Sequence, residues 1–170
     1  MATNLQFIKS ASGSSVSTLS ITDCFNDNYA VYQVFISKVD ITGIEWVEMQ
    51  YLDTSGNALT STVYDEAVLE MLSYGSFSQG RSTSRDEHGR LIRLQDDSDE
   101  GAGCLITIFN PYTSGSYTFA KNQSSAHTDS GMFASKGIFV YRGTDVVAGL
   151  KFKLNSLSYD NITVNVYGVK

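Results

Sequence analysis

The sequence has little positive charge. Its 170 residues include 12 Lys and Arg against 18 Asp and Glu, which gives a formal net charge of −6 at pH 7. Proteins that bind DNA or RNA neutralise phosphates with clustered Lys and Arg, and no basic stripe of this kind occurs in the chain. The composition therefore argues against direct nucleic-acid binding.

Cysteine and proline are also scarce. The chain has one Pro and two Cys, and Cys24 and Cys104 lie far apart, outside any Cys-x-x-Cys or Cys–His spacing. We interpret them as buried thiols that act as small apolar side chains. A disulfide between them is the alternative if the compartment is oxidising and their strands are neighbours.

Long apolar runs are missing. No stretch approaches the roughly eighteen apolar residues of a membrane-spanning helix. The opening MATNLQFIKS has neither the basic region nor the apolar region of a secretory signal peptide. We therefore expect a protein that is made in the cytoplasm and does not insert into a membrane.

Motifs for cofactors and metals are not found. The glycines of Gly101–Gly103 lead into a predicted strand, whereas a dinucleotide fingerprint follows a strand and opens a helix. The acidic run Asp96–Glu100 lacks the EF-hand pattern. His88 stands beside Asp86 and Glu87, but neighbouring loop residues need not converge as metal ligands must. The sequence predicts no cofactor and no metal.

A hydrolytic site is not indicated either. His127, Asp129 and Ser130 fall within four residues, but the members of a catalytic triad normally come from separate segments, and no serine stands in a Gly-x-Ser-x-Gly elbow. A glycosidase needs two facing carboxylates, which any β-sandwich could supply, and one sequence identifies no such pair. We predict a protein that is not an enzyme.

The residues that are plentiful are those of a sheet protein. Hydrophobic residues make up 42% of the chain, with ten Tyr and nine Phe, and aromatic residues favour strands. A chain of this length buries enough surface to fold as one domain without disulfides or metals. We predict a single domain over residues 1–170.

Short apolar or alternating runs recur along the chain, separated by turn residues. The expected strands are Leu5–Lys9, Ser15–Ile21, Tyr29–Val39, Ile44–Leu52, Arg90–Leu94, Cys104–Asn110, Ser116–Lys121, Lys136–Arg142, Val146–Leu154 and Ile162–Val169, with a hairpin turn at Asp53–Asn57. Many short strands with frequent turns indicate a β-sandwich or barrel. We predict an all-β antiparallel sandwich, jelly-roll-like, with at most one short helix.

The final segment, NITVNVYGVK, alternates most cleanly. Ile162, Val164 and Val166 share one face of the expected strand, while Thr163 and Asn165 share the other. Chain ends fray unless they are held. We therefore expect this strand to be paired inside a sheet.

One segment reads as a helix. In residues 62–75, apolar residues recur at helical spacing, with Asp65 and Glu66 in the expected first turn and Gly75 as a stop signal. An edge strand is the alternative for the same residues.

Two polar segments are expected to be exposed loops. Ser76–Gly103 is rich in Ser, Gly and both charge signs, with only the short strand inside it, and Asn122–Gly131 is similarly polar. Binding functions are commonly carried by long surface loops. The first of the two is therefore the expected place for a variable binding surface.

Four aromatic residues are candidate surface contacts. Tyr74 and Phe77 flank the glycine of SYGSF, and Tyr112 and Tyr117 flank a Gly/Ser turn. Tyr beside Ser and Gly is typical of adaptable binding surfaces. The alternative is that these rings cap the ends of the sandwich core.

Three parts of the chain are distinctive: LQFIKSASGSSVSTLSITDCF, IFNPYTSGSYTFAKNQSSA, and KGIFVYRGTDVVAGLKFKL with the closing ITVNVYGVK. These segments resemble a family of short virion structural proteins of tailed bacteriophages that infect marine bacteria and cyanobacteria. The resemblance runs almost end to end and is weakest over Ser76–Gly103. None of these segments is a catalytic motif, so no functional residue carries over.

The resemblance implies a β-sandwich module on the exterior of the virion, related to phage fibre and particle-surface proteins. Such modules commonly form trimers, so the expected partners are copies of the chain and other virion proteins, with a host surface glycan or receptor as a further candidate. The leading hypothesis is a non-enzymatic tail, fibre or baseplate protein with a role in host-receptor contact. The alternatives are a capsid decoration (cement) protein and, third, a carbohydrate-binding module or glycan hydrolase.

Overall fold

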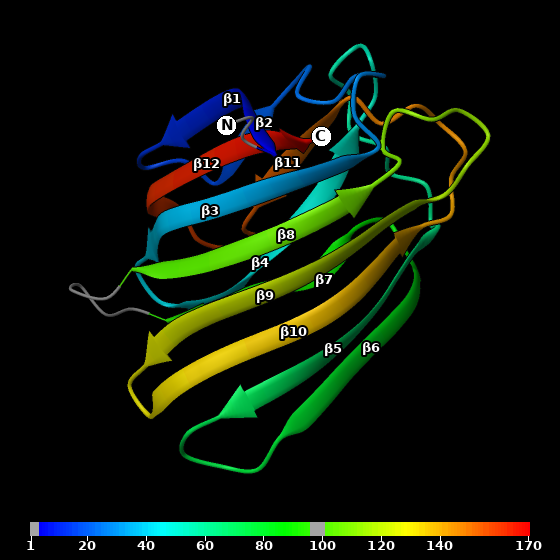
Figure 1. Cartoon of the computed structure of the whole chain (residues 1–170). Coiled ribbons are helices and arrows are strands. Elements are labelled where there is room, and N and C mark those ends of the chain that lie inside the picture. The colour runs from blue at the N-terminus through cyan, green and yellow to red at the C-terminus, as the bar shows by residue number, and fades with distance from the viewer. Residues whose placement is uncertain (1–3, 96–100) are drawn as a thin grey trace.

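Two antiparallel sheets make up the fold. The structure is a computed structural model that describes residues 4–95 and 101–170, and every regular element in this part of the chain is a strand. The larger sheet has the strand order β1-β12-β3-β8-β9-β10-β5-β6 and the smaller has the order β2-β11-β4-β7 (Figure 1). The larger sheet contains β1 (Leu5–Gly13), β12 (Tyr159–Val169), β3 (Val31–Ile41), β8 (Ala102–Phe109), β9 (Thr118–Thr128), β10 (Gly131–Tyr141), β5 (Tyr64–Leu72) and β6 (Ser78–Arg85). The smaller contains β2 (Thr18–Ile21), β11 (Gly149–Lys153), β4 (Ile44–Leu52) and β7 (His88–Gln95).

Eight of these strands are paired as in a jelly roll. In that fold, the first strand pairs with the last, the second with the second to last, and so on inward. Here β1 pairs with β12, β2 with β11, β3 with β8 and β4 with β7, all antiparallel. The prediction of an all-β, jelly-roll-like sandwich is confirmed.

The other four strands are two inserted hairpins. The β5–β6 hairpin lies in the chain between β4 and β7, and the β9–β10 hairpin lies between β8 and β11. β9 pairs with β8, and β10 pairs with β5, so the two hairpins join edge to edge. Together they extend one sheet of the jelly roll from four strands to eight.

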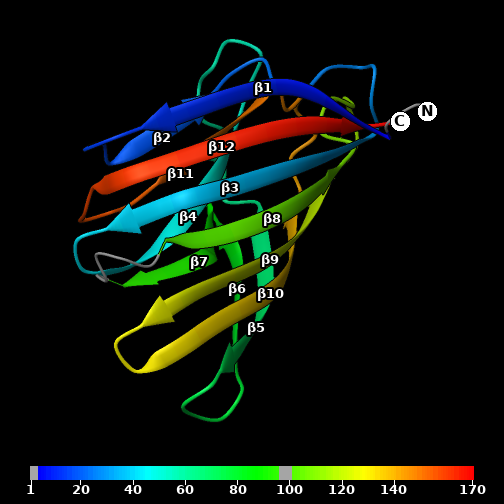
Figure 2. The same ribbon diagram turned by 60° about the vertical axis from the view of Figure 1, so that its left-hand side comes forward.

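The core lies between the two layers, with the smaller sheet behind the larger one (Figure 2). Strands of both sheets alternate, so that Tyr32, Val34 and Ile36 of β3 face inward and are buried, as are Val164 and Val166 of β12. Burying one such apolar side chain stabilises the fold by about 1.5–3 kcal/mol. The core continues beneath the inserted hairpins, where the inward-facing Tyr64 of β5 and Tyr141 of β10 are fully buried.

The expected helix over residues 62–75 is wrong. The alternative of an edge strand is right in that the segment is a strand, but β5 lies between β10 and β6 and not at the edge of the sheet. Residues Tyr64–Leu72 form β5, in which Tyr64, Glu66 and Val68 face inward while Ala67 and Leu69 are exposed. The inward Glu66 hid the period-2 pattern, because its carboxylate is buried only through contacts with a distant strand. Its two oxygens accept hydrogen bonds from Gly89 N and Arg90 Nη1 of β7.

Both predicted long loops are also wrong. Ser76–Gly103 contains β6 and β7, although the acidic run Asp96–Glu100 lies outside the described residues. Asn122–Gly131 is mostly the second half of β9, where polar side chains are buried in pairs. Asn122 Nδ2 donates to the carbonyl of Leu91 at 2.6 Å, and the hydroxyls of Ser124 and Ser135 lie 2.6 Å apart. Polar residues with buried partners look like loop residues in a sequence.

Three other predictions are confirmed. The final segment is β12, an interior strand between β1 and β3. Asp53–Asn57 is a turn, in which Gly56 has φ +80° and the Asp53 carboxylate accepts hydrogen bonds from Ser55 N and Asn57 N. Cys24 and Cys104 are buried free thiols, so the disulfide alternative is not realised.

Candidate functional site

The outer face of the eight-stranded sheet is an open surface with exposed side chains. Strand register aligns one outward residue from each strand in a single row across the whole sheet. In sheet order the row is Phe7, Tyr167, Gln33, Thr107, Lys121, Ile138, Ala67 and Arg81. These residues come from all parts of the chain, so the row exists only in the folded protein.

The rows on either side of this row differ in polarity. Toward the β8–β9 loop the next row is apolar over six strands: Leu5, Val169, Val31, Phe109, Phe119 and Val140. On the other side the row reads Asn165, Phe35, Leu105, Gln123, Lys136, Leu69 and Gln79. The face is therefore mixed, with an apolar margin beside a polar and cationic centre.

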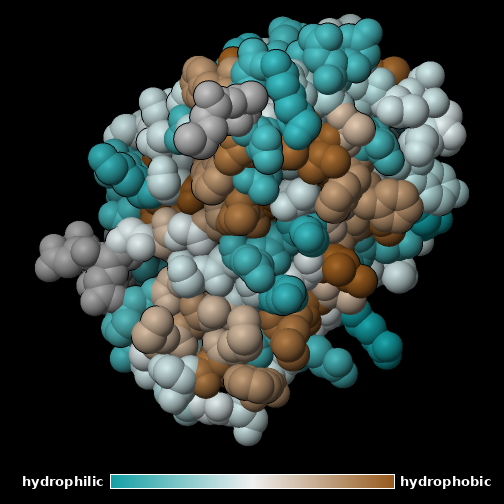
Figure 3. Space-filling model, in the orientation of Figure 1, coloured by the Kyte–Doolittle hydropathy of each residue, from teal (hydrophilic) through white to brown (hydrophobic). Residues whose placement is uncertain are grey.

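Large apolar side chains are exposed on this face. Ile138 is 68% exposed, Phe7 55%, Phe119 48% and Leu69 45%. Figure 3, which views this face, shows brown hydrophobic groups with teal side chains between them near the centre. Exposed apolar patches of this kind mark interaction surfaces in soluble proteins.

A hollow of about 830 Å³ opens in the centre of the face. Its walls come from β3, β8, β9, β10, β5 and β6, and four of those six strands belong to the inserted hairpins. A second hollow of about 500 Å³ lies beside it, lined by Phe109, Phe119 and Val140, and the two share Ala67, Lys121 and Ile138. The second hollow is the apolar continuation of the first.

Three cations line the first hollow. They are Lys121 of β9, Lys136 of β10 and Arg81 of β6, and all three side chains are exposed. None forms an ion pair with a described residue, although the Lys121 ammonium lies 5.8 Å from the centroid of the Phe109 ring. The nearby Asp65 is bound by Arg142, whose Nε lies 2.8 Å from Asp65 Oδ2.

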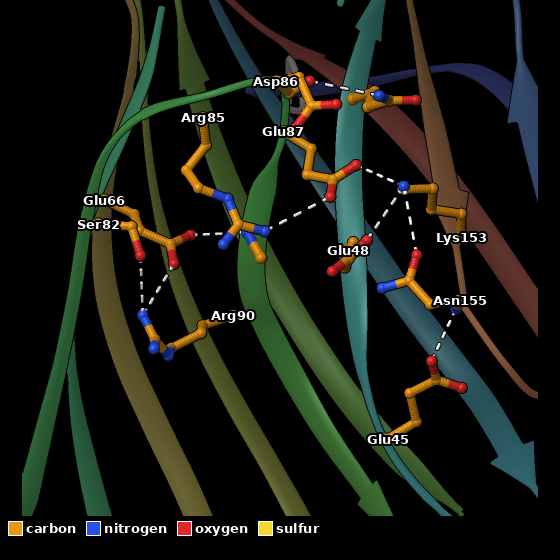
Figure 4. Close-up of polar contacts among 12 residues, drawn as sticks. Glu45, Glu48, Glu66, Ser82, Arg85, Asp86, Glu87, Arg90, Lys153 and Asn155 are labelled. Carbon is orange, nitrogen blue, oxygen red and sulfur yellow. Dashed lines mark hydrogen bonds and ion pairs between the residues drawn. The ribbon is translucent and has the colours of Figure 1, made fainter. Parts of the chain in front are cut away.

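A second polar cluster, beside the four-stranded sheet, has its charges paired (Figure 4). The Lys153 ammonium lies 3.2 Å from Glu48 Oε2 and 2.5 Å from Glu87 Oε2, and Arg85 also contacts Glu87. Burial raises the pKa of Glu48, and the charge of Glu87 adds to this. Burial lowers the pKa of Lys153, but the hydrogen bonds that its ammonium donates to Glu87 and Glu48 outweigh this effect, and the pKa is raised.

This cluster ties two strands of the smaller sheet to the β6–β7 turn, where the chain passes from the larger sheet to the smaller one. Lys153 is in β11, Glu48 in β4 and Glu87 in the β6–β7 turn, so one ammonium joins three segments. No motif indicates the Glu48–Glu87 pair, because the two residues meet only through the fold. A polar pocket of about 390 Å³ borders Glu48, Trp46 and Arg90.

His88 lies in the core rather than in a site with Asp86 and Glu87. The rings of Tyr64 and Phe139 pack against it at 4.8 Å and 4.9 Å between centroids, and the Tyr51 ring lies 5.7 Å away. Burial lowers the pKa of His88 to about 3. The neighbouring Asp86 is exposed and Glu87 points to Lys153, while His88 lies in β7 and not in the expected loop.

The four candidate aromatics do not form one surface. Tyr74 and Phe77 lie in the β5–β6 turn, and Tyr112 and Tyr117 lie in the β8–β9 loop. Register places the first turn beside the β9–β10 turn and the second loop at the other end of β9, so the pairs lie at opposite ends of the sheet. Phe77 is 72% exposed, whereas Tyr112 packs against the core.

Nowhere in residues 4–95 and 101–170 do three His, Cys, Asp or Glu side chains gather closely enough to hold a metal ion. The same part of the chain has no helix with the length and apolarity needed to cross a bilayer. Comparisons of the chain with models of protein families, with curated proteins and with solved structures find no significant match.

Proposed function

We propose that this chain is a non-enzymatic structural protein of a bacteriophage virion, part of the tail, fibre or baseplate, that contacts the host through the outer face of its eight-stranded sheet. The observation that carries the proposal is the exposure of Phe7, Leu69, Phe119 and Ile138 on that face. Exposing these apolar side chains to water does not stabilise an isolated chain, but it provides contact area to a protein that binds a partner.

Three further points support the proposal. Segments along most of the chain resemble virion structural proteins of tailed phages. Jelly rolls are common in viral and lectin domains, which is an argument from analogy of fold alone. Both inserted hairpins serve to widen one face, and additions to a scaffold commonly carry its specific function.

Capsid decoration is the second candidate. The apolar row from Leu5 to Val140 is of the kind that becomes buried between neighbouring subunits, and burial at each site would stabilise the assembled shell. Such a protein would also form homo-oligomers, with a trimer as the expected state. Location on the particle and copy number separate the two candidates.

Immunogold electron microscopy of intact virions tests the proposal. Gold at the tail, fibre tips or baseplate is the expected result, accompanied by adsorption of the purified protein to host cells. Gold distributed over the icosahedral shell, with copies in proportion to capsomers, would establish decoration instead. Absence of the protein from purified virions would refute both candidates.

A further inference from the structure

We propose that the central hollow of the eight-stranded sheet binds an anionic polysaccharide, one whose sugars carry carboxylate or sulfate groups. The inference deepens the proposed function, on which its meaning as host contact rests. Most of the hollow is built from the inserted hairpins. The jelly roll is complete without the inserted hairpins, yet β9, β10, β5 and β6 supply most of the walls of the hollow.

The three cations lie at different points along the hollow. Lys121 stands opposite Ile138 on β10, and Lys136 is two residues before Ile138, so the two lysines are diagonal neighbours about 7–8 Å apart at the backbone. Arg81 lies in the same row as Lys121, three strands away, at about 14 Å. The three charges therefore span the hollow rather than converging on one point. This spacing suits a chain of charges better than one small anion.

No carboxylate of a described residue lines the hollow to neutralise its three cations. The chain has a net charge of −6, and no Asp or Glu stands among the described residues that line the hollow. By contrast, Arg85, Arg90, Arg142 and Lys153 each hold a carboxylate. Unpaired cations in a shared hollow offer charge-assisted hydrogen bonds to an incoming anion.

Neutral polar side chains complete the donor set. Gln33, Gln79 and Gln123 line the same hollow with Thr107. Each amide carries both donors and acceptors, and so does a hydroxyl, which matches the hydroxyl groups of a sugar. The apolar side chains of Leu69, Leu105 and Ile138 stand among them and can pack against the C–H faces of sugar rings. Shallow open walls allow a polymer to pass across the sheet.

Charge density favours a polysaccharide over a nucleic acid. Duplex DNA carries one charge about every 1.7 Å, so much of it would face the acidic remainder of this protein. A polysaccharide with about one charge per sugar places fewer charges in that repulsive field. At physiological salt, charges beyond about 8 Å are largely screened, so the cations of the hollow act locally.

The test measures binding of the purified full-length chain to four polymers in low salt by biolayer interferometry. They are polygalacturonate (carboxylated), dextran sulfate (sulfated), neutral dextran and a single-stranded oligodeoxynucleotide. We expect binding to one or both anionic polysaccharides, none to dextran, and affinity that falls as salt rises. The dissociation constant for the oligonucleotide should be at least about tenfold higher than that for the polysaccharide.

Matched variants locate the site. The pair Lys121→Gln and Lys136→Gln should weaken polysaccharide binding about tenfold or more, because two charge-assisted contacts are lost. The control pair Lys151→Gln and Lys170→Gln removes the same charge from β11 and from the residue after β12, and should leave binding unchanged. Lys121→Arg with Lys136→Arg should retain it. Melting curves check that each variant is folded.

Several outcomes would overturn the inference. An equal loss of polysaccharide affinity in the Lys121/Lys136 variant and in the Lys151/Lys170 control would show a diffuse effect of net charge. Equal affinity for the oligonucleotide and the polysaccharides would show a general polyanion-binding surface. Lack of binding to both anionic polysaccharides at low salt would leave the hollow for an acidic protein partner. Immunogold location is read independently of sugar binding, so failure of this inference and failure of the proposed virion function are separate results.

Discussion

The ring of His88 stands edge-on to the ring of Tyr64, with 4.8 Å between centroids and 77° between planes. His88 is fully buried, and neither ring nitrogen has a hydrogen-bond partner among the described residues. The contact joins β7 of the jelly roll to β5 of an inserted hairpin, and Tyr141 and Phe139 of the other hairpin pack at the same place. The core of the two insertions is therefore organised around a neutral imidazole.

Acid should destabilise the protein through His88. Burial lowers the pKa of His88 to about 3, although the charge of Asp65 opposes the shift, while the unfolded chain titrates near 6.5. Below pH 6.5 the unfolded state binds the proton and the folded state does not, so the free energy of unfolding falls by about 1.4 kcal/mol per pH unit toward pH 3. Urea unfolding between pH 7.5 and 4.5 measures this slope.

The variant His88→Phe should remove the contribution of His88 to the slope of the free energy of unfolding against pH, while the contribution of the carboxylates remains. Phenylalanine keeps an aromatic ring at this position and cannot be protonated. A variant with the same slope as the natural chain would show that His88 is already protonated, or exposed, in the folded state.

Removal of the Lys153 ammonium should be costly. Lys153→Met leaves Glu48 and Glu87 buried side by side without their shared cation, and breaking a buried ion pair typically costs about 3–5 kcal/mol. The double variant Glu48→Gln, Lys153→Met should recover part of this loss. Chemical unfolding at pH 7 measures both values. A loss below about 1 kcal/mol for Lys153→Met would mean that water already solvates the two carboxylates.

For Lys153→Met we also expect the pH dependence of stability to differ from that of the natural chain. Without Lys153, the pKa of the Glu48 carboxyl, which burial already raises, lies still further above its value in the unfolded chain, so the folded state binds more protons. Lys153→Met should therefore regain stability relative to the natural chain as pH falls from 7 toward 5. Parallel stability curves for the two proteins would contradict the ion-pair account.

Outer-face apolar residues should matter for binding and not for stability. Phe119→Ser and Ile138→Ser change exposed side chains, so the free energy of unfolding should shift by less than about 1 kcal/mol. Host-cell adsorption, or incorporation into particles, should fall. The control Ile44→Ser alters a residue of β4 that is 58% exposed and should retain both. Equal losses with Ile44→Ser would point to general stickiness instead.

Both thiols should be inert in the folded protein. Burial raises the pKa of Cys24 and of Cys104 to about 12, so almost no thiolate is present at pH 8. Ellman's reagent should react with neither cysteine until denaturant is added, and with both afterwards. Prompt reaction at one site would show local opening of the β2–β3 connection or of β8.

Some of this architecture is determined locally, and the sequence alone was enough. β12 alternates cleanly because one of its faces is buried in the core, and the Asp53–Asn57 turn depends on residues within the turn itself. β5 could not be identified with certainty, since Glu66 is tolerated inward only through Gly89 and Arg90. Likewise, the second half of β9 looked like a loop because Ser124 is matched by Ser135 on the next strand.

The candidate binding surface was decided by tertiary structure. Lys121, Lys136 and Arg81 are ordinary surface cations in the sequence, and only the registers of β9, β10, β5 and β6 place them in one hollow. Tyr74 and Tyr112 looked alike in the sequence, yet the fold puts them at opposite ends of a sheet. Alternation along one strand is a local property that the sequence carries. Pairing between distant strands sets which side chains meet, and it depends on the packing of the whole core.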